Sequence, residues 1–170
     1  LLLGTAAACW FYFLFLMCNW NLEWSDESYY LINIRNPDEY SGFNGITKYA
    51  YFFNFIYPLI HSLAWLRFLP IILITILILL IARNLSRRSD ISIKSGHYFL
   101  LVVTSSLHLF TTFNWLATPN YNSLALTGIL IVILAMGSFT ISSWKHILLV
   151  ALGVAVTALG KPTSAIGILI

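Results

Sequence analysis

Acidic residues gather in one segment of the chain, where they are candidates for acid–base chemistry. Five of the six aspartate and glutamate residues fall within 17 positions: Glu23, Asp26, Glu27, Asp38 and Glu39. A carboxylate held against an acceptor hydroxyl can take up its proton, so this segment is a candidate source of a general base. The alternative is that the acids only keep a surface loop soluble.

The residues that follow the acids are aromatic rather than polar. They are Tyr49, Tyr51, Phe52, Phe53, Phe55, Tyr57 and Trp65. Aromatic side chains concentrate at membrane–water interfaces, so we predict that this segment packs onto the bilayer as short amphipathic helices. Carboxylates beside such a surface are partly desolvated, and desolvation makes a carboxylate a better base.

Membrane-spanning helices are the elements expected to hold this loop. Hydrophobic residues make up 59% of the chain and charged residues 9%, whereas soluble domains carry about 25% charged residues. At about 20 apolar residues per crossing, we predict spans over residues 1–18, 68–82, 98–116, 123–139 and 147–159. The predicted fold is an all-α, polytopic transmembrane helical bundle, one domain over residues 1–170, with a loop over residues 19–67.

The two ends of the sequence indicate a fragment of a longer protein. There is no initiator methionine, and a sixth span is expected to begin after Pro162 and to continue past the last residue. A signal peptide is the alternative for the first span. That span lacks the charged start and the cleavage site of a signal peptide.

Basic residues predict the orientation. They gather in the loops after the second and fourth spans: Arg83, Arg87, Arg88, Lys94, Lys145 and His146. The positive-inside rule makes these loops cytoplasmic, so loop 19–67 and Lys161 lie on the extracytoplasmic side. The net charge of +3 is modest and unevenly spread, which gives no support for nucleic-acid binding.

Lys161 is the second candidate for chemistry. It lies between Gly160 and Pro162, where a helix must end or kink. A lysine there is either an interfacial anchor or a fixed cation for a phosphate. The two cysteines and four histidines show no metal-ligand spacing.

The order of these features resembles the N-terminal half of a GT-C-type glycosyltransferase. Protein O-mannosyltransferases and bacterial lipid A aminoarabinose transferases are the most similar in pattern. Four motifs carry the resemblance: the Asp26-Glu27 pair past the first span, Phe55–His61 with its proline, the polar segment Ala117–Leu124, and Gly153–Pro162. In one departure, Asn120 and Asn122 stand where relatives often carry a charged residue.

The resemblance implies transfer of a sugar from a polyprenyl-phosphate-linked donor to a sugar, lipid or protein acceptor on the extracytoplasmic face. Asp26 would be the catalytic base, and Glu27 would position the acceptor or tune Asp26. The substrate-binding residues would be Lys161, Arg67, Tyr121 and Asn122. The two cations would stabilise the leaving phosphate. No cofactor is implied, and a divalent metal ion stays open because some GT-C enzymes use one and others do not.

Two other functions fit part of the pattern. A transporter or flippase would explain the helix breaks at Pro119 and Pro162 and the intramembrane His108. It would not explain acids gathered in an outer loop, because coupling sites lie near the bilayer midplane. A non-catalytic scaffold subunit of a membrane complex is the third possibility.

Overall fold

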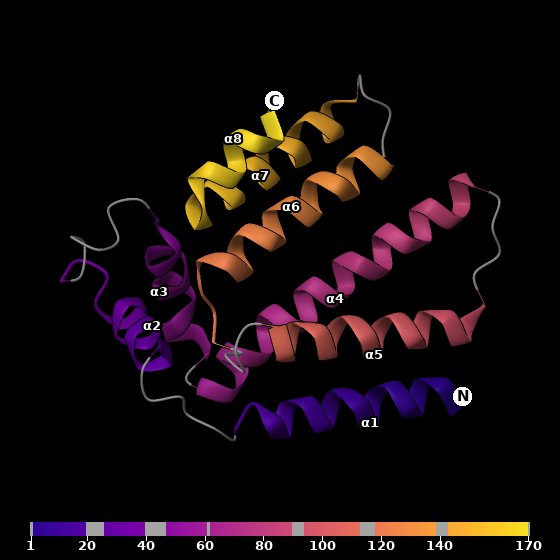
Figure 1. Cartoon of the computed structure of the whole chain (residues 1–170), viewed down its shortest axis with the longest axis horizontal. Helices are drawn as coiled ribbons and strands as arrows, with labels where there is room; N and C mark the ends of the chain where they lie inside the picture. Colours follow the sequence, from indigo (N-terminus) through magenta and orange to yellow (C-terminus); the bar gives the residue numbers. More distant parts are fainter. Residues whose placement is uncertain are drawn as a thin grey trace.

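The residues that the structure describes form eight helices and no strand. This computed structural model describes residues 2–19, 26–39, 47–60, 62–89, 94–112, 118–138 and 143–169, without the side chains of 26, 27, 108–112, 138 and 169. The predicted intramembrane His108 side chain therefore lies outside the description. The helices are α1 (Leu2–Met17), α2 (Asp26–Arg35), α3 (Tyr49–Ile60), α4 (Leu63–Arg88), α5 (Ser95–Thr112), α6 (Tyr121–Ser138), α7 (Trp144–Gly160) and α8 (Pro162–Leu169), shown in Figure 1.

The all-α class predicted from the sequence is confirmed. Helices α1, α4, α5, α6 and α7 fall on the five segments predicted as spans, and α8 begins at Pro162. Within the described ranges, α4 is the one helix long and apolar enough to cross a membrane, while α1, α6 and α7 are apolar but shorter. Helix α4 exceeds its predicted span at both ends and finishes on Arg87 and Arg88, cations that are favourable at a helix C-terminus.

The long helices run alternately up and down, so the bundle has two ends (Figure 1). Helix α4 packs against α5 and α6, α1 packs against α4 and α5, and α7 packs along α6. We call one end the α2–α3 end, because it carries these two short helices. Helices α4, α6 and α8 start at this end, and α1, α5 and α7 finish there. We call the other the basic end, after its residues Arg83, Arg87, Arg88, Lys94 and Lys145.

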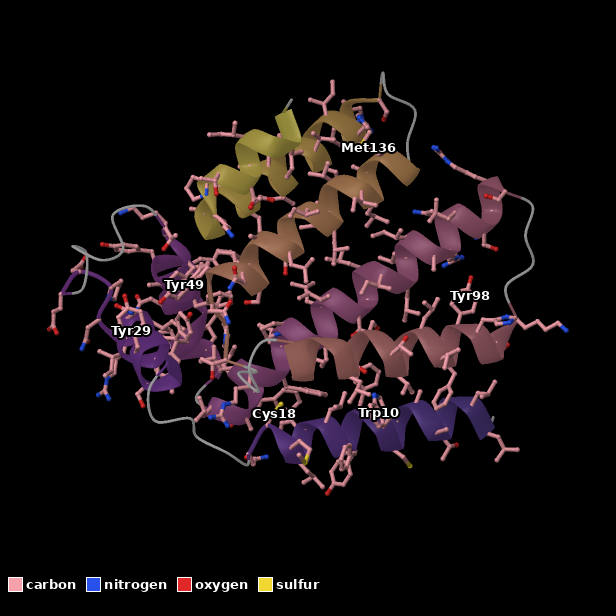
Figure 2. All side chains as sticks on the ribbon, viewed as in Figure 1. Trp10, Cys18, Tyr29, Tyr49, Tyr98 and Met136 are labelled. Atoms are coloured by element: carbon pink, nitrogen blue, oxygen red, sulfur yellow. The ribbon has the colours of Figure 1, made fainter. Side chains whose placement is uncertain are left out.

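Aromatic contacts hold α1 against α4. The Phe15 ring lies 4.9 Å from the Trp65 ring and 5.4 Å from the Phe68 ring, measured between centroids. Nearer the start of α1, the Trp10 indole donates a hydrogen bond of 2.8 Å to the Ser106 hydroxyl of α5 (Figure 2). Helix α1 is therefore fixed to both of its neighbours.

Three glycines allow α6 and α7 to approach closely. A Cβ atom added to Gly128 would lie 2.5 Å from the carbonyl oxygen of Gly153, and one added to Gly153 would lie 2.6 Å from a Val132 methyl group. A Cβ added to Gly160 would lie 2.5 Å from the carbonyl oxygen of Tyr121. No larger side chain fits at these positions without moving backbone. Close helix pairs of this kind, built on small residues, are typical of membrane proteins.

The bundle buries several polar side chains within its apolar core and exposes many large apolar ones. The buried polar residues are Asn33, Arg67, Thr75, Ser106, Thr118, Asn120, Ser123, Thr127 and Thr157. Large apolar side chains are exposed on several helices; examples are Phe55 at 79%, Ile147 at 62% and Leu100 at 59% of their surface. Apolar residues still form most of the core, in clusters around Leu14 and Tyr49, but buried polar groups and large exposed apolar patches are both exceptions in soluble proteins.

The glycine contact between α6 and α7 predicts a position-specific loss of stability. Gly128→Ala should lower the free energy of unfolding by about 1–3 kcal/mol relative to Gly137→Ala, because its Cβ would overlap the backbone of α7. Gly137 is the matched control on the same helix, since its added Cβ would meet only the Asn84 Cβ at 3.9 Å. Unfolding of the purified chain by SDS in mixed micelles measures the difference. Equal stability of the two variants would contradict the close contact.

Candidate active site at the α2–α3 end

Helix α2 begins at the predicted catalytic pair. Asp26 and Glu27 form its first turn, a position where the helix dipole favours negative charge. Their side chains lie outside the description, so the structure gives their backbone position only. At the other end of α2, the Asn54 amide donates hydrogen bonds to the carbonyl oxygens of Ile34, at 2.8 Å, and Arg35, at 3.4 Å. Helix α3 thereby caps α2.

Three tyrosines join α2 to α3 and to the start of α6. The Tyr30 ring lies 5.9 Å from the Tyr49 ring and 6.2 Å from the Tyr121 ring, and the Tyr49 and Tyr121 rings are 6.2 Å apart. We call these three residues the tyrosine cluster; Figure 2 shows Tyr49 between α2 and α6. Tyr49 is 1% exposed, and burial raises the pKa of its hydroxyl well above the ordinary value. Tyr121, predicted to bind substrate, is thus linked to the helix that begins at Asp26.

The start of α6 is a capping box. The Asn120 side-chain oxygen accepts hydrogen bonds from the backbone N–H groups of Asn122, at 2.9 Å, and Ser123, at 3.1 Å. The Ser123 hydroxyl in turn accepts a hydrogen bond of 3.0 Å from the Asn120 N–H. Asn120 therefore satisfies the free N–H groups of the first turn. The side chain of Asn122, also predicted to bind substrate, is partly exposed beside this cap.

Lys161 ends α7 next to the start of α6. Its N–H donates a hydrogen bond of 2.6 Å to the Thr157 carbonyl, its backbone is extended, and its side chain is exposed. The preceding Gly160 lies against the backbone of Tyr121. The structure thus brings together two of the predicted substrate-binding residues, Lys161 and Tyr121.

A second lysine at this junction was missed by the sequence analysis. The Lys48 N–H donates a hydrogen bond of 2.7 Å to the Leu159 carbonyl, which ties the start of α3 to the end of α7. The exposed Lys48 ammonium lies 5.3 Å from the Tyr51 ring centroid. The sequence signal was available, because Lys48 is the one basic residue directly before the aromatic segment. Its closeness to Lys161 depends on tertiary contacts.

Tyr51 links the junction of α3, α6 and α7 to Asp38, in the turn after α2. Its hydroxyl donates a hydrogen bond of 2.8 Å to a carboxylate oxygen of Asp38. This hydrogen bond raises the pKa of the Tyr51 hydroxyl above its ordinary value. Asp38 therefore already has a partner, which distinguishes it as a matched control for Asp26.

Arg67 has a structural contact in α4. It is 2% exposed, and its guanidinium donates a hydrogen bond of 2.6 Å to the Cys18 carbonyl just after α1. A cation that binds a free carbonyl at a helix C-terminus is favourable. Arg67 thus packs between α1 and α4, whereas Lys161 belongs to the junction of α3, α6 and α7. The contact of Arg67 with a substrate phosphate stays a prediction.

An apolar groove lies beneath α3 and reaches the start of α6. Its volume is about 170 Å³, and α3, α4, α6 and α7 all contribute to its wall. On α6, its lining residues Ser123, Thr127 and Ile131 are four residues apart and therefore share one helix face. They span about 12 Å at 1.5 Å per residue. The groove thus begins two residues from Tyr121 and runs inward along α6.

The described side chains contain no group of three metal ligands. The side chains of Asp26 and Glu27 are not among the described ones, so this finding does not address metal binding by the acidic pair.

Comparison of the chain with protein-family models, with curated proteins and with solved structures finds no match. The resemblance to GT-C enzymes therefore stays a prediction, and function is inferred from the chain's own residues.

Proposed function

We propose that the chain is the membrane part of a multi-pass protein, with α1, α4, α5, α6 and α7 crossing the bilayer. The exposed apolar side chains and the polar side chains buried within the core support this proposal, because lipid solvates apolar side chains and buried polar groups can join neighbouring helices. The hydroxyls inside α5, α6 and α7 bond back to their own helix: Ser106 to Val102, Thr127 to Ser123, and Thr157 to Gly153. Their burial therefore leaves these hydroxyls satisfied.

The charge distribution supports the proposed orientation. Five of the nine lysines and arginines lie at the basic end, and the described acids all belong to α2 or to the turn after it. By the positive-inside rule, the basic end faces the cytoplasm and the α2–α3 end faces outward.

Cysteine labelling in intact cells tests this orientation. With Cys9 and Cys18 replaced by alanine, cysteine introduced at Ser41 should react with a membrane-impermeant maleimide, because loop 19–67 faces outward. Cysteine at Ser89, after the last turn of α4, should react only after the cells are opened. Labelling of position 89 in intact cells would reverse the orientation and remove the basis for every site assignment.

We further propose that the α2–α3 end transfers a sugar from a polyprenyl-phosphate-linked donor to an acceptor hydroxyl. The proposal rests mainly on the apolar groove, whose lining residue Ser123 lies in the first turn of α6, the turn that begins at Tyr121 and that Gly160 of α7 contacts. Such a donor has an apolar tail and an anionic phosphate, so it needs an apolar channel with a cation at its outer end. The groove would take the part of the tail nearest the phosphate, and Lys161 and Lys48 would face the phosphate.

The proposed reaction uses the acid at the start of α2. The acceptor oxygen attacks the anomeric carbon and loses its proton to the Asp26 carboxylate. A bond forms between that oxygen and the anomeric carbon, and the bond from the anomeric carbon to the phosphate oxygen breaks. Polyprenyl phosphate leaves, and Lys161 stabilises its growing negative charge. Asp26 stands one helical turn before Tyr30 of the tyrosine cluster, a position that supports this assignment, and Glu27 would orient the acceptor.

Lys161→Met tests the phosphate contact. One charge-assisted hydrogen bond is worth about 1.5–3 kcal/mol, so affinity for a short isoprenoid phosphate should fall by roughly 10- to 150-fold. Lys145→Met is the matched control, because Lys145 is equally exposed but starts α7 at the basic end. Titration of the ligand against each purified protein measures both. Equal affinity of the two variants would leave Lys161 as an interfacial anchor.

Asp26→Asn tests the catalytic base. Asparagine keeps the size of the side chain but cannot take a proton at neutral pH, so turnover should fall by about 10²–10⁴-fold. Release of free polyprenyl phosphate from a panel of polyprenyl-phosphate-linked sugars measures turnover. Donor binding and expression should change little, because asparagine keeps the shape of aspartate and most of its hydrogen bonding.

Asp38→Asn is the control for this experiment, since its carboxylate already binds the Tyr51 hydroxyl and should not act as base. Loss of turnover in Asp38→Asn with normal turnover in Asp26→Asn would show that the base is misassigned. Normal turnover in both would remove the catalytic carboxylate from the proposal.

A further inference from the structure

A second cavity lies at the basic end, away from the candidate active site. Its volume is about 380 Å³, it is open to the surface, and its walls are the start of α1, the end of α4 and the start of α5. Three of its lining residues are polar: Arg83, Ser95 and Tyr98. Figure 2 shows Tyr98 near the start of α5. The remaining wall is apolar and includes Ala7, Leu79, Phe99 and Val102.

The polar and apolar parts of the wall are separated along the helices. On α4, Leu79 precedes Arg83 by four residues, about 6 Å further from the basic end. On α5, Ser95 is the first residue, and the buried Val102 lies about 10 Å further in. The cavity therefore has a polar mouth at the end of the bundle and an apolar floor.

Positive charge surrounds the mouth. The Arg83 side chain is exposed, and among the described residues it makes no hydrogen bond or ion pair. Arg87 lies one helical turn beyond Arg83 on α4, Lys94 directly precedes α5, and none of the acids in the described ranges lies at this end. An anionic group at the mouth would therefore meet several cations.

We propose that this cavity binds an anionic phospholipid of the cytoplasmic leaflet, with its phosphate at Arg83 and Ser95 and the start of an acyl chain against Ala7 and Val102. A cationic mouth over an apolar floor matches the two parts of such a lipid, and basic pockets between helices on the cytoplasmic side bind anionic head groups. The inference rests on the membrane insertion proposed above but not on glycosyl transfer.

Native mass spectrometry of the chain released from detergent tests the site with two probes of equal acyl length, phosphatidylglycerol and phosphatidylcholine. The unaltered chain should retain phosphatidylglycerol with roughly tenfold higher affinity, the factor that one charge-assisted hydrogen bond supplies. Arg83→Gln should remove this preference. Arg88→Gln should keep it, because Arg88 is exposed on the same helix but does not line the cavity.

A cavity-filling variant tests the apolar floor. Gly4 lines the cavity, and a Cβ added there meets no atom within 4 Å. Gly4→Leu should therefore keep the fold and lower retention of both lipids about tenfold. Retention unchanged by Gly4→Leu would overturn the site.

Three further outcomes would overturn the proposal. Equal retention of the two lipids by the unaltered chain would remove the preference for anionic lipid. Equal losses in Arg83→Gln and Arg88→Gln would replace the site by a diffuse surface charge. Tighter, Arg83-dependent binding of an isoprenoid phosphate would assign the cavity to a different lipid. Retention of neither lipid would instead count against the proposed membrane insertion of the bundle. The experiment therefore distinguishes failure of this lipid site from failure of membrane insertion.

Discussion

The close contact between α6 and α7 fixes the geometry of the candidate site. Gly128 and Gly153 let the two backbones meet, and Gly160 continues the contact to the backbone of Tyr121. Lys161 therefore follows α7 directly beside the start of α6. The Tyr121 ring contacts the rings of Tyr30 on α2 and Tyr49 on α3, which joins these two helices to the start of α6. The positions of Lys161, the tyrosine cluster and α2 thus all depend on the contact that the three glycines allow between α6 and α7.

The helices themselves leave little room for chemistry inside the bundle. The buried hydroxyls of Ser106, Thr127 and Thr157 bond to carbonyls of their own helices. Among the described residues, the lysines and arginines lie toward the two ends of the bundle. The two ends differ in charge and in the cavity that each offers: an apolar groove beneath α3 at one, and a cavity with Arg83 in its wall at the other.

Hydropathy was sufficient to locate the long helices, because an apolar run of that length has few other stable forms. The helix break at Lys161 was also predicted, because glycine and proline flank this residue, and α7 ends at Gly160 while α8 begins at Pro162. The sequence analysis missed Lys48, the capping role of Asn120, and the hydrogen bond from the Arg67 guanidinium to the Cys18 carbonyl. These features depend on how separate helices meet or on local hydrogen bonds. No periodicity in the sequence encodes them.

Photo-crosslinking with a polyprenyl phosphate that carries a photoreactive group on its first isoprene unit tests the central claim most directly. The account predicts saturable labelling of peptides that contain the groove residues of α3, α4 and α6, among them Phe53, Leu73 and Thr127. Unlabelled polyprenyl phosphate should compete, and an uncharged polyprenol should compete less well because it lacks the phosphate for Lys161. Labelling confined to the outer faces of α5 or α7, or labelling that does not saturate, would contradict a donor site at the α2–α3 end.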